Sequence, residues 1–572
     1  MNGAEAILRC LQAEGVEVVF GYPGGAVIPL YDALHKVDLR HVLVRQEQGA
    51  AFMAAGYART TGRVGVAIGT SGPGATNLVT GIADCYMDSV PTVFITGQVA
   101  RPLIGRDSFQ EVDVTGITLP IVKHSYLVQD PEELPQIIRE AFHLARSGRP
   151  GPVLIDVPKD VQLVECLASI DVPTSELRGT PTVNASFDEQ IAAAAALIDA
   201  STRPTLYVGG GSLDAAPELL EFAEKTDIPV TWTLMGKGAF PEDHELSVGM
   251  LGMHGAAYAN YAITRCDTMI VLGARFDDRV TGKLSTFNPE AKVVHVDIDA
   301  AELGKNRFPD APVNATVAEA LRALTPACAS GDRAAWKQQV AEWKQRHPLV
   351  AHVARPNGEI RPQHLLEKLT AATGGRAIVS TDVGQHQMWA AQFYQPKEPR
   401  LFLTSGGLGT MGAGLPLALG AWFARPDREV WLVTGDGSLQ MNIQELAVAV
   451  IAKAPIKILL INNGYLGMVR QWQELFHERN YSETWLHDKP TPDGTPADVL
   501  SPDFCALMEA YGGKARRVWS DQQVNDAIDW ARTVQDGPVL LEFIVNEEEN
   551  VWPMVPAGGD TGEPILEPEG VE

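Results

Sequence analysis

The chain has 572 residues, of which 45% are hydrophobic and 20% charged, and its formal net charge is −25. This length indicates several domains, each with enough apolar residues to form a core, as in ordinary globular proteins. The negative charge argues against nucleic acid or an anionic membrane surface as a partner, because both repel an acidic protein. Solubility is the simpler reason for the acidity.

Cysteine usage and hydropathy bear on the compartment. The six cysteines are scattered, without a CxxC pair or a Cys/His cluster, so we expect neither a disulfide framework nor a zinc site. No apolar run approaches the roughly 18 residues that a membrane-spanning helix needs. The N-terminus, Met-Asn-Gly-Ala-Glu-Ala, has no basic region followed by an apolar one, which predicts no signal or transit peptide. We therefore expect a cytoplasmic protein.

Apolar strands alternate with helical segments in three blocks, which favours parallel sheets flanked by helices and an α/β fold throughout. We expect an N-terminal domain at 1–165, a central domain at 190–335, a C-terminal domain at 360–550 and an irregular tail at 551–572. Polar or charged stretches at about 166–189 and 330–358 are predicted linkers. Strands are predicted at 16–20, 64–68, 92–96 and 153–157 in the first block, and at 205–208, 268–272 and 292–296 in the second.

The first block contains Glu47 at the close of a short apolar run. A glutamate is usually a solvated surface residue. Here, however, the following run 48–56 is mostly small and apolar, which indicates a buried setting. Burial raises the pKa of a carboxyl group and suits it to proton transfer. The turn 69–77, Gly-Thr-Ser-Gly-Pro-Gly-Ala-Thr-Asn, leads from a strand to a helix and could hold an anion with its amides.

The third block contains Gly435-Asp436-Gly437 and, further on, Asn462-Asn463. Strands are predicted at 429–434 and 456–461, with a helix at 443–452 between them. This order brings two strand ends together at the carboxyl edge of a parallel sheet, where open α/β folds bind ligands. Asp and Asn supply hard oxygen ligands for a Mg²⁺ that holds a diphosphate, and glycines let the backbone approach it. An ordinary tight turn is the alternative.

Many ordered segments match one family. They lie at 20–25 (FGYPGG), 47–50 (EQGA), 70–77 (TSGPGATN), 109–111 (FQE), 147–160 (SGRPGPVLIDVPKD), 252–255 (GMHG), 275–282 (RFDDRVTG), 295–299 (HVDID), 384–389 (GQHQMW), 405–412 (SGGLGTMG) and 466–472 (LGMVRQW), besides the GDG and NN motifs. Through them, from about residue 3 to 558, the chain resembles the catalytic large subunits of acetolactate synthases (acetohydroxyacid synthases) of the biosynthetic, FAD-containing type. The resemblance implies two domains that bind thiamine diphosphate (ThDP) around a central FAD-binding domain.

The resemblance also implies an activity and partners. Family members condense two 2-keto acids with loss of CO₂: two pyruvates give 2-acetolactate, and pyruvate with 2-ketobutyrate gives 2-aceto-2-hydroxybutyrate, in branched-chain amino-acid biosynthesis. Their minimum active unit is a homodimer, in which the glutamate at Glu47 of one subunit meets the diphosphate site of another. A separate regulatory small subunit is expected as well. The flavin of this family is chiefly structural.

Site residues are carried over by position. The catalytic candidates are Glu47, which would hydrogen-bond the aminopyrimidine ring of ThDP, with Gln110 and Lys123. Mg²⁺ would be held by Asp436, Asn463 and the backbone carbonyl of Tyr465. The implied ThDP contacts are Tyr22, Pro23, Gly24, Gly384, Gln385, His386, Gly409, Met411, Gly435, Gly437 and Ser438. The implied FAD contacts are Gly209, Gly210, Gly211, Met253, His254, Gly273, Arg275 and Asp297, and the implied substrate contacts are Phe109, Arg279, Met468 and Trp472.

Two of these assignments have plain structural alternatives, and two positions depart from the family pattern. Met411 among glycines can serve packing alone, and Arg279 can pair with Asp277 or Asp278 rather than with a substrate carboxylate. Many relatives have His where this chain has Gln46, which we expect to tune activity. Relatives commonly carry Thr-Asp-Ala before FQE, where Arg106-Asp107-Ser108 adds a cation to the channel mouth.

Three other functions remain open. A pyruvate oxidase-like enzyme would also use ThDP and FAD, and a noncatalytic ThDP-fold homologue would bind without turnover. Gly407-Leu-Gly-Thr-Met-Gly412 is a literal GxGxxG after an apolar run, with Asp427 further on, which is typical of nicotinamide dehydrogenases. Such patterns are common in a chain with 53 glycines. Intact Glu47, Asp436 and Asn463 argue against a noncatalytic copy.

Overall fold

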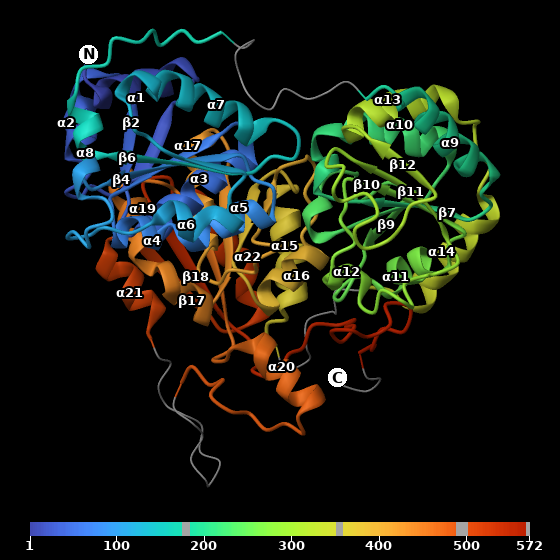
Figure 1. The fold of residues 1–572 in the computed structure, drawn as a ribbon. Coiled ribbons are helices and arrows are strands. Elements are labelled where there is room, and N and C mark those ends of the chain that lie inside the picture. The colour runs from blue at the N-terminus through green and yellow to red at the C-terminus, as the bar shows by residue number, and fades with distance from the viewer. Residues whose placement is uncertain (174–183, 350–357, 488–501, 568–572) are drawn as a thin grey trace.

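The computed structural model describes residues 1–173, 184–349, 358–487 and 502–567. They form three α/β domains, each built on a six-stranded sheet in which every neighbouring pair of strands is parallel. In Figure 1 the N-terminal domain is blue, the middle domain green, and the C-terminal domain yellow to red. The predicted fold class, three parallel-sheet α/β domains, is confirmed.

The N-terminal sheet has the strand order β2-β1-β3-β4-β6-β5. Its strands are β1 Val18–Gly21, β2 Arg40–Leu43, β3 Gly65–Gly69, β4 Thr92–Gln98, β5 His124–Leu127 and β6 Pro152–Pro158. The four predicted strands of this block are confirmed within about two residues at their ends, because their apolar runs are buried on both faces. The edge strand β5 was not predicted, since His-Ser-Tyr-Leu is partly exposed and carries no apolar run.

The helices of this domain are α1 Gly3–Ala13, α2 Ile28–Ala33, α3 Glu47–Thr61, α4 Pro73–Asn77, α5 Val79–Met87, α6 Val114–Thr118, α7 Leu134–Arg146 and α8 Lys159–Leu163.

Helix α3 packs this domain against the C-terminal one. Thirteen of the 15 residues of α3 are buried, because it packs against α17 (Gly414–Ala424). A Cβ on Gly56 would lie 2.2 Å from the carbonyl oxygen of Leu417, and one on Gly420 would lie 2.0 Å from that of Met53. Glycine at both positions lets the two backbones touch.

The middle sheet has the order β12-β11-β10-β7-β8-β9, which reads 3-2-1-4-5-6 from the other edge and is the doubly wound dinucleotide-binding order. Its strands are β7 Pro204–Val208, β8 Val230–Trp232, β9 Ser247–Met250, β10 Thr268–Leu272, β11 Lys292–Asp297 and β12 Ala311–Asn314. Its helices are α9 Phe187–Ala200, α10 Ala216–Thr226, α11 Ala257–Arg265, α12 Asp278–Thr281, α13 Val317–Ala327 and α14 Ala334–Arg346.

Helix α14 lies in the segment 330–358 that the sequence predicts as a linker. Trp336, Val340 and Trp343 recur at helical spacing and are buried against the middle domain. The linker prediction is therefore wrong for this part, which is a charged helix with a narrow apolar stripe. Residues 174–183 and 350–357 of the predicted linkers, and 568–572 of the predicted tail, lie outside the described residues.

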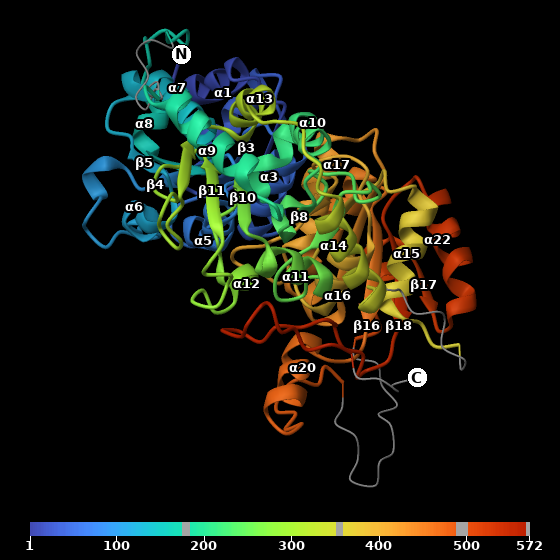
Figure 2. The same ribbon diagram turned by 90° about the vertical axis from the view of Figure 1, so that its right-hand side faces the viewer.

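The C-terminal sheet has the order β14-β13-β15-β16-β18-β17. Its strands are β13 Ile378–Thr381, β14 Phe402–Leu403, β15 Val430–Gly435, β16 Lys457–Asn462, β17 Lys514–Val518 and β18 Val539–Ile544. The helices, besides α17, are α15 Pro362–Thr373, α16 Gln385–Phe393, α18 Asp436–Leu439, α19 Leu446–Ala452, α20 Gly467–Phe476, α21 Phe504–Tyr511 and α22 Val524–Thr533. Figures 1 and 2 show α20 projecting from the body of the domain.

The segment after β18 crosses from the C-terminal domain to the middle domain without forming a helix or strand over the described residues 551–567. The amide of Val555 donates to the carbonyl of Met253 (2.8 Å), and the Thr561 hydroxyl donates to the carbonyl of Thr281 (3.0 Å).

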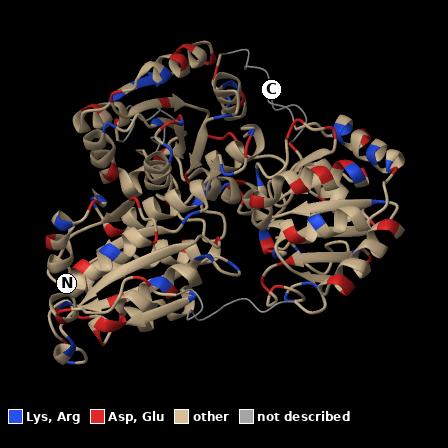
Figure 3. Cartoon of the chain, turned by 90° about the horizontal axis from the view of Figure 1, so that it is seen from above, with Lys and Arg blue, Asp and Glu red and all other residues tan. Residues whose placement is uncertain are grey.

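Seen from above, acidic and basic residues are interspersed on the outer helices (Figure 3). Within the described ranges, no helix is both long and apolar enough to cross a membrane.

Candidate active site

A pocket of about 90 Å³ opens at the carboxyl edge of the C-terminal sheet, where β13, β15 and β16 end. β15 and β16 are parallel neighbours, so the predicted meeting of these two strand ends is confirmed. The pocket brings together these residues that the resemblance assigns to ThDP, metal or substrate: Gly384, Gln385, His386, Met411, Gly435, Asp436, Gly437, Ser438, Asn463, Tyr465 and Met468. Gly409 is not among the lining residues but lies in the same loop as Met411, with φ of +69°.

Asp436 and His386 are two titratable groups with shifted pKa values that line this pocket. Burial raises the pKa of Asp436 to about 7, and the negative charge of Glu542 adds to the shift. The described residues place no cationic side chain in an ion pair with Asp436. Burial lowers the pKa of His386 to about 3, so its ring is neutral at physiological pH, and its Nε2 finds no hydrogen-bond partner among the described residues. An unpaired buried carboxylate beside amide oxygens suits a divalent cation, and a free imidazole nitrogen suits a phosphate oxygen.

The pocket walls are too close for side chains at their glycines. A Cβ on Gly467 would lie 2.1 Å from Oε1 of Gln385 and 2.6 Å from Nδ2 of Asn463, and one on Gly435 would lie 2.7 Å from Nδ1 of His386. Asn463 donates to Gln385 (3.2 Å) and accepts from the amide of Tyr465 (3.2 Å). The loops after the three strands therefore form one hydrogen-bonded unit.

The loop 405–412, which carries Met411, is held by acidic residues of the N-terminal domain. The Ser405 hydroxyl donates to Asp84, while the amides of Gly406 and Gly407 donate to Asp88 at 2.9 and 2.6 Å. Buried Arg59 donates to both carboxylates, at 2.9 Å each. Within the GxGxxG match, the amides of Gly407, Thr410 and Gly412 already donate to Asp88, Ser405 and Asp382, which argues against a nicotinamide site there. Asp84 and Asp88 were not predicted, because their partners lie more than 300 positions away in the sequence.

Glu47 lies at the start of α3, away from this pocket. Its side chain is buried, as predicted, with 8% exposed, and it accepts a hydrogen bond from Nδ2 of Asn77 (2.9 Å) in the 69–77 turn. Gln46 caps α3 by accepting from the amide of Gln48 (2.8 Å), which gives this departure from the family pattern a structural role. No residue of the N-terminal domain is among the described residues that line the pocket.

A second buried carboxylate, near Glu47, is not predicted by the sequence. Glu445, from the C-terminal domain, accepts from the amide of Arg45 (3.0 Å), and its Oε1 lies 2.5 Å from where a Cβ on Gly49 would stand. Burial raises its pKa to about 7. Glu445 therefore fixes the turn that presents Glu47, although a single glutamate in a polar stretch gave no signal in the sequence.

Other predicted residues lie in different surroundings. Gln110 has φ of +59°, and its carbonyl oxygen lies 2.8 Å from where a Cβ on Gly72 would stand. It therefore borders the 69–77 turn, whose Asn77 bonds to Glu47. Phe109 is 89% exposed. Tyr22, Pro23 and Gly24 follow β1, where Gly24 meets Thr70.

The structure brings Lys123 neither to the Asp436 pocket nor to the 69–77 turn beside Glu47. Lys123 Nζ donates to the carbonyls of Leu144 and Ser147 (2.6 Å), which places its charge at the C-terminal end of α7, and burial lowers its pKa to about 8. Helix capping is thus the role that the geometry gives this residue.

The two remaining substrate candidates, Arg279 and Trp472, do not line the pocket. Trp472 packs against Phe476, with ring centres 5.2 Å apart and the ring planes tilted by 54°. Arg279 is largely exposed and lies 3.7 Å from Asp278, and its Nη1 is 3.7 Å from the sulfur of Met253. The ion-pair alternative for Arg279 is thus present in the structure, although an exposed pair at this distance contributes little to stability.

A larger cavity, of about 440 Å³, lies between the three domains. It sits where the strand order of the middle sheet reverses, between β7 and β10, which is where such folds bind dinucleotides. A Cβ on Gly209 would lie 2.1 Å from the carbonyl oxygen of Gly273, so these strand ends touch. Six of the eight predicted FAD contacts line it: Gly209, Gly210, Gly211, Gly273, Arg275 and Asp297.

The other two predicted FAD contacts do not line this cavity. Met253 instead meets the segment after β18, and the carbonyl of the buried His254 accepts from Gln392 (2.9 Å). Met87, Arg149 and Phe402 complete the cavity from the neighbouring domains. Sequence patterns within one domain could not have indicated these walls.

Comparison with known proteins agrees with this geometry. Three models of the thiamine pyrophosphate enzymes match the chain: the N-terminal TPP binding domain at residues 1–117, the central domain at 191–324 and the C-terminal TPP binding domain at 382–543.

The curated relatives extend over nearly the whole chain. The acetolactate synthase large subunits of Mycobacterium tuberculosis and Corynebacterium glutamicum are each 49% identical over 98% of this chain, and 91% and 90% of those proteins are covered. A chloroplastic acetolactate synthase of Nicotiana tabacum is 47% identical over 100% of this chain and 85% of its own length. The chain therefore belongs to the thiamine pyrophosphate enzymes and, among them, to the acetolactate synthase large-subunit family.

Proposed function

We propose that the chain condenses two 2-keto acids with loss of one carboxylate as CO₂, as its relatives' name implies. Pyruvate as both substrates would give 2-acetolactate, and 2-ketobutyrate as acceptor would give 2-aceto-2-hydroxybutyrate. The observation that carries the proposal is the pocket around Asp436, where the residues that the family uses for cofactor and metal converge at one sheet edge.

Asp436, Asn463 and the backbone carbonyl of Tyr465 would hold Mg²⁺, and Gln385 and His386 would contact the diphosphate of ThDP. The fit rests on the buried, unpaired carboxylate of Asp436 and the unpartnered Nε2 of His386. When bound, ThDP supplies the nucleophilic carbon and the electron sink that decarboxylation requires. Met411, on a loop anchored by Ser405, would support the cofactor from below.

Glu47 would exchange a proton with the aminopyrimidine ring, held in place by its hydrogen bond from Asn77. Because Glu47 and the Asp436 pocket do not meet in one chain, we infer a homodimer in which each site combines Glu47 of one subunit with the pocket of the other. Apolar side chains exposed on both domains, Phe109, Leu408 and Met441, support this inference, since they would be buried by such pairing.

The cavity between the domains would hold FAD. Its position at the β7/β10 reversal and its glycine walls support a dinucleotide, and its volume falls in the usual range of ligand sites, roughly 300–1,000 Å³. FAD there would serve the structure rather than redox chemistry. Two relatives are named large subunits, which further supports a small regulatory subunit as a partner.

One assay separates the candidates. Purified protein with pyruvate, ThDP, Mg²⁺ and FAD should form acetolactate and CO₂ without consuming oxygen. Hydrogen peroxide and acetyl phosphate, with oxygen uptake, would instead identify a pyruvate oxidase. Bound cofactors without any product would identify a binding protein.

A further inference from the structure

Helix α20 carries Met468 and Trp472, two of the proposed substrate residues, yet it is held in an unusual way. Surface helices are normally fixed by an apolar stripe that packs on the core. Of the ten residues of this fully described helix only Arg470 and Gln471 are buried, both completely. Met468 is only partly buried against the C-terminal core, so the directional hydrogen bonds of the two buried polar residues contribute most to the orientation of α20.

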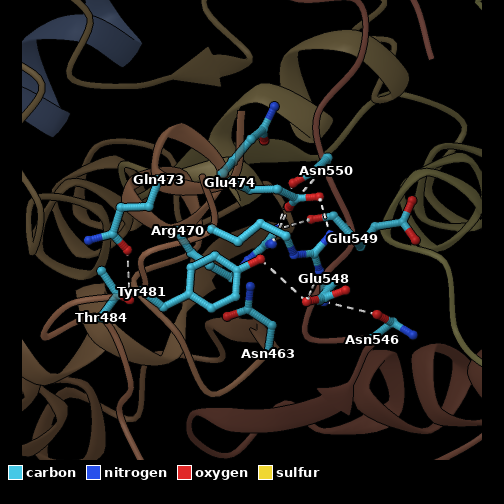
Figure 4. Close-up of polar contacts among 12 residues, drawn as sticks. Asn463, Arg470, Gln473, Glu474, Tyr481, Thr484, Asn546, Glu548, Glu549 and Asn550 are labelled. Carbon is cyan, nitrogen blue, oxygen red and sulfur yellow. Dashed lines mark hydrogen bonds and ion pairs between the residues drawn. The ribbon is translucent and has the colours of Figure 1, made fainter. Parts of the chain in front are cut away.

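The Arg470 guanidinium binds three groups around it (Figure 4). Its Nη1 donates to the Glu474 carboxylate at 2.6 Å, one turn along the helix. Its Nη2 donates to Oδ1 of Asn550 at 2.6 Å and to the carbonyl of Glu549 at 3.2 Å. Asn550 also donates to Glu474 at 3.1 Å and closes the ring of contacts. Arg470 thus ties α20 to the segment that follows β18.

The aromatic surroundings link Arg470 to the proposed metal site. Its guanidinium carbon lies 6.0 Å from the ring centres of both Tyr465 and Tyr481. Its Nε–H has no hydrogen-bond partner among the described residues. A buried cation with an incomplete set of hydrogen-bond partners contributes little net stability, because its desolvation offsets much of the attraction. The directional hydrogen bonds of Arg470 instead restrict the orientation of α20.

Gln471 extends the connection to the pocket. Its Oε1 accepts from the amide of Val551 (2.9 Å) and from Nε2 of Gln385 (3.0 Å). Gln385 in turn accepts from Asn463, a proposed metal ligand. At the first residue of the helix, Gly467 leaves no room between α20 and Gln385. The rotation of α20 is therefore set by polar contacts on both of its sides.

We propose that Arg470 is a positioning residue that orients α20, and so places Met468 and Trp472 for selection of the second keto acid. Arg470 does not line the pocket itself and acts through the helix that carries these residues. The assigned substrate rests on the proposed function, whereas the orientation of the helix can be measured without it.

The test compares Arg470→Met with Arg479→Met in the full-length protein. Met keeps a long apolar stem but removes every donor. Arg479 is a matched control: its side chain is 53% exposed, and it pairs with the same Glu474, at 3.5 Å, and with Glu548. By hydrogen exchange, amides of 467–476 should exchange roughly 10- to 100-fold faster in Arg470→Met. Arg479→Met should match the wild type, and Arg470→Lys should recover part of the protection.

The second readout is the ratio of the two products when pyruvate and 2-ketobutyrate compete as acceptors. Arg470→Met should shift this ratio, and Arg479→Met should not. Wild-type exchange in α20 of Arg470→Met would overturn the proposal, and faster exchange with an unchanged ratio would overturn the role in acceptor selection.

A second variant is needed if Arg470→Met destabilises the whole protein. If Arg470→Met lowers the melting temperature of the whole protein, Asn550→Leu, which removes one acceptor at similar size, is measured by the same two readouts. If the wild type forms no acetolactate, the proposed function fails, and the exchange measurement still decides whether Arg470 orients the helix.

Discussion

The N-terminal and C-terminal sheets share one strand order, 2-1-3-4-6-5 counted from the first strand of each, but their carboxyl edges differ. In both, the order reverses between the first and third strands, where doubly wound folds bind ligands. At the C-terminal edge this position opens into the Asp436 pocket. At the N-terminal edge the loops close on each other, with Gly24 against Thr70 and Gly72 against Gln110. The shared strand order puts a possible binding position at the same edge of both sheets, and the loops that follow the strands determine whether a pocket forms there.

Two buried aspartates make the difference sharper. Burial raises the pKa of Asp156, at the N-terminal edge, and of Asp436, at the C-terminal edge, to about 7 in each case. Asp156 accepts from the side chains of Thr96 (2.7 Å) and Gln98 (2.9 Å). Among the described residues, Asp436 accepts only from backbone amides, and it faces a pocket. We infer that only Asp436 needs a cation.

The largest effect is expected from Asp436→Ala. Without its carboxylate, Mg²⁺ should no longer hold the diphosphate, and calorimetric affinity for ThDP in the presence of Mg²⁺ should fall by more than about 100-fold. Asp156→Asn is the matched control and should keep the wild-type affinity. Unchanged ThDP binding by Asp436→Ala would refute the metal assignment.

Next in size is Glu47→Gln, which removes the acid but keeps a group that can bond to Asn77. ThDP should still bind, while exchange of the C2 proton of its thiazolium ring, followed by NMR, should slow by about 10²–10⁴-fold. Asn77→Asp, which removes the donor but leaves Glu47 in place, should slow it less. Exchange at the wild-type rate in Glu47→Gln would remove Glu47 from this role.

The packing of α3 on α17 fixes the two edges relative to each other, so it should be sensitive to a single methyl group. Gly56→Ala should lower stability by about 1–3 kcal/mol, because the new Cβ meets the Leu417 carbonyl. Gly537→Ala, at a site with nothing within 4 Å, should change the melting temperature little. Equal melting temperatures for the two variants would mean that this helix contact is not tight.

The last effect concerns pH. The pKa of Asp156 is about 7 in the folded protein and about 3.9 when unfolded, so between these values the folded state binds a proton that the unfolded state has lost. Its contribution to stability is therefore full below about pH 4 and is lost as pH rises through 7. Melting temperatures of Asp156→Asn should lack this fall, and parallel curves for the two proteins would contradict the assignment.

The strands, and the meeting of Asp436 with Asn463 at one sheet edge, could be predicted from sequence because each depends on a local pattern. The buried runs of β3, β4, β6 and β15 are continuous apolar segments, and Asp436 and Asn463 follow neighbouring strands. The wall of the pocket could be assigned only through the family.

Residues defined by distant partners could not be predicted. Asp84 and Asp88 hold a loop more than 300 positions away, and Glu445 supports a turn 400 positions before it. Lys123 caps a helix instead of reaching a pocket. Glu47 also lies outside the Asp436 pocket of its own chain, and the proposed homodimer would bring the two together.

Mixing two inactive variants tests that shared site most directly. Glu47→Gln chains and Asp436→Ala chains, each inactive alone, are allowed to exchange subunits, with mixed dimers verified by native mass spectrometry. Each mixed dimer would contain one intact site, so random pairing should restore acetolactate synthesis to roughly a quarter of the wild-type rate. No activity from verified mixed dimers would contradict a site shared between subunits.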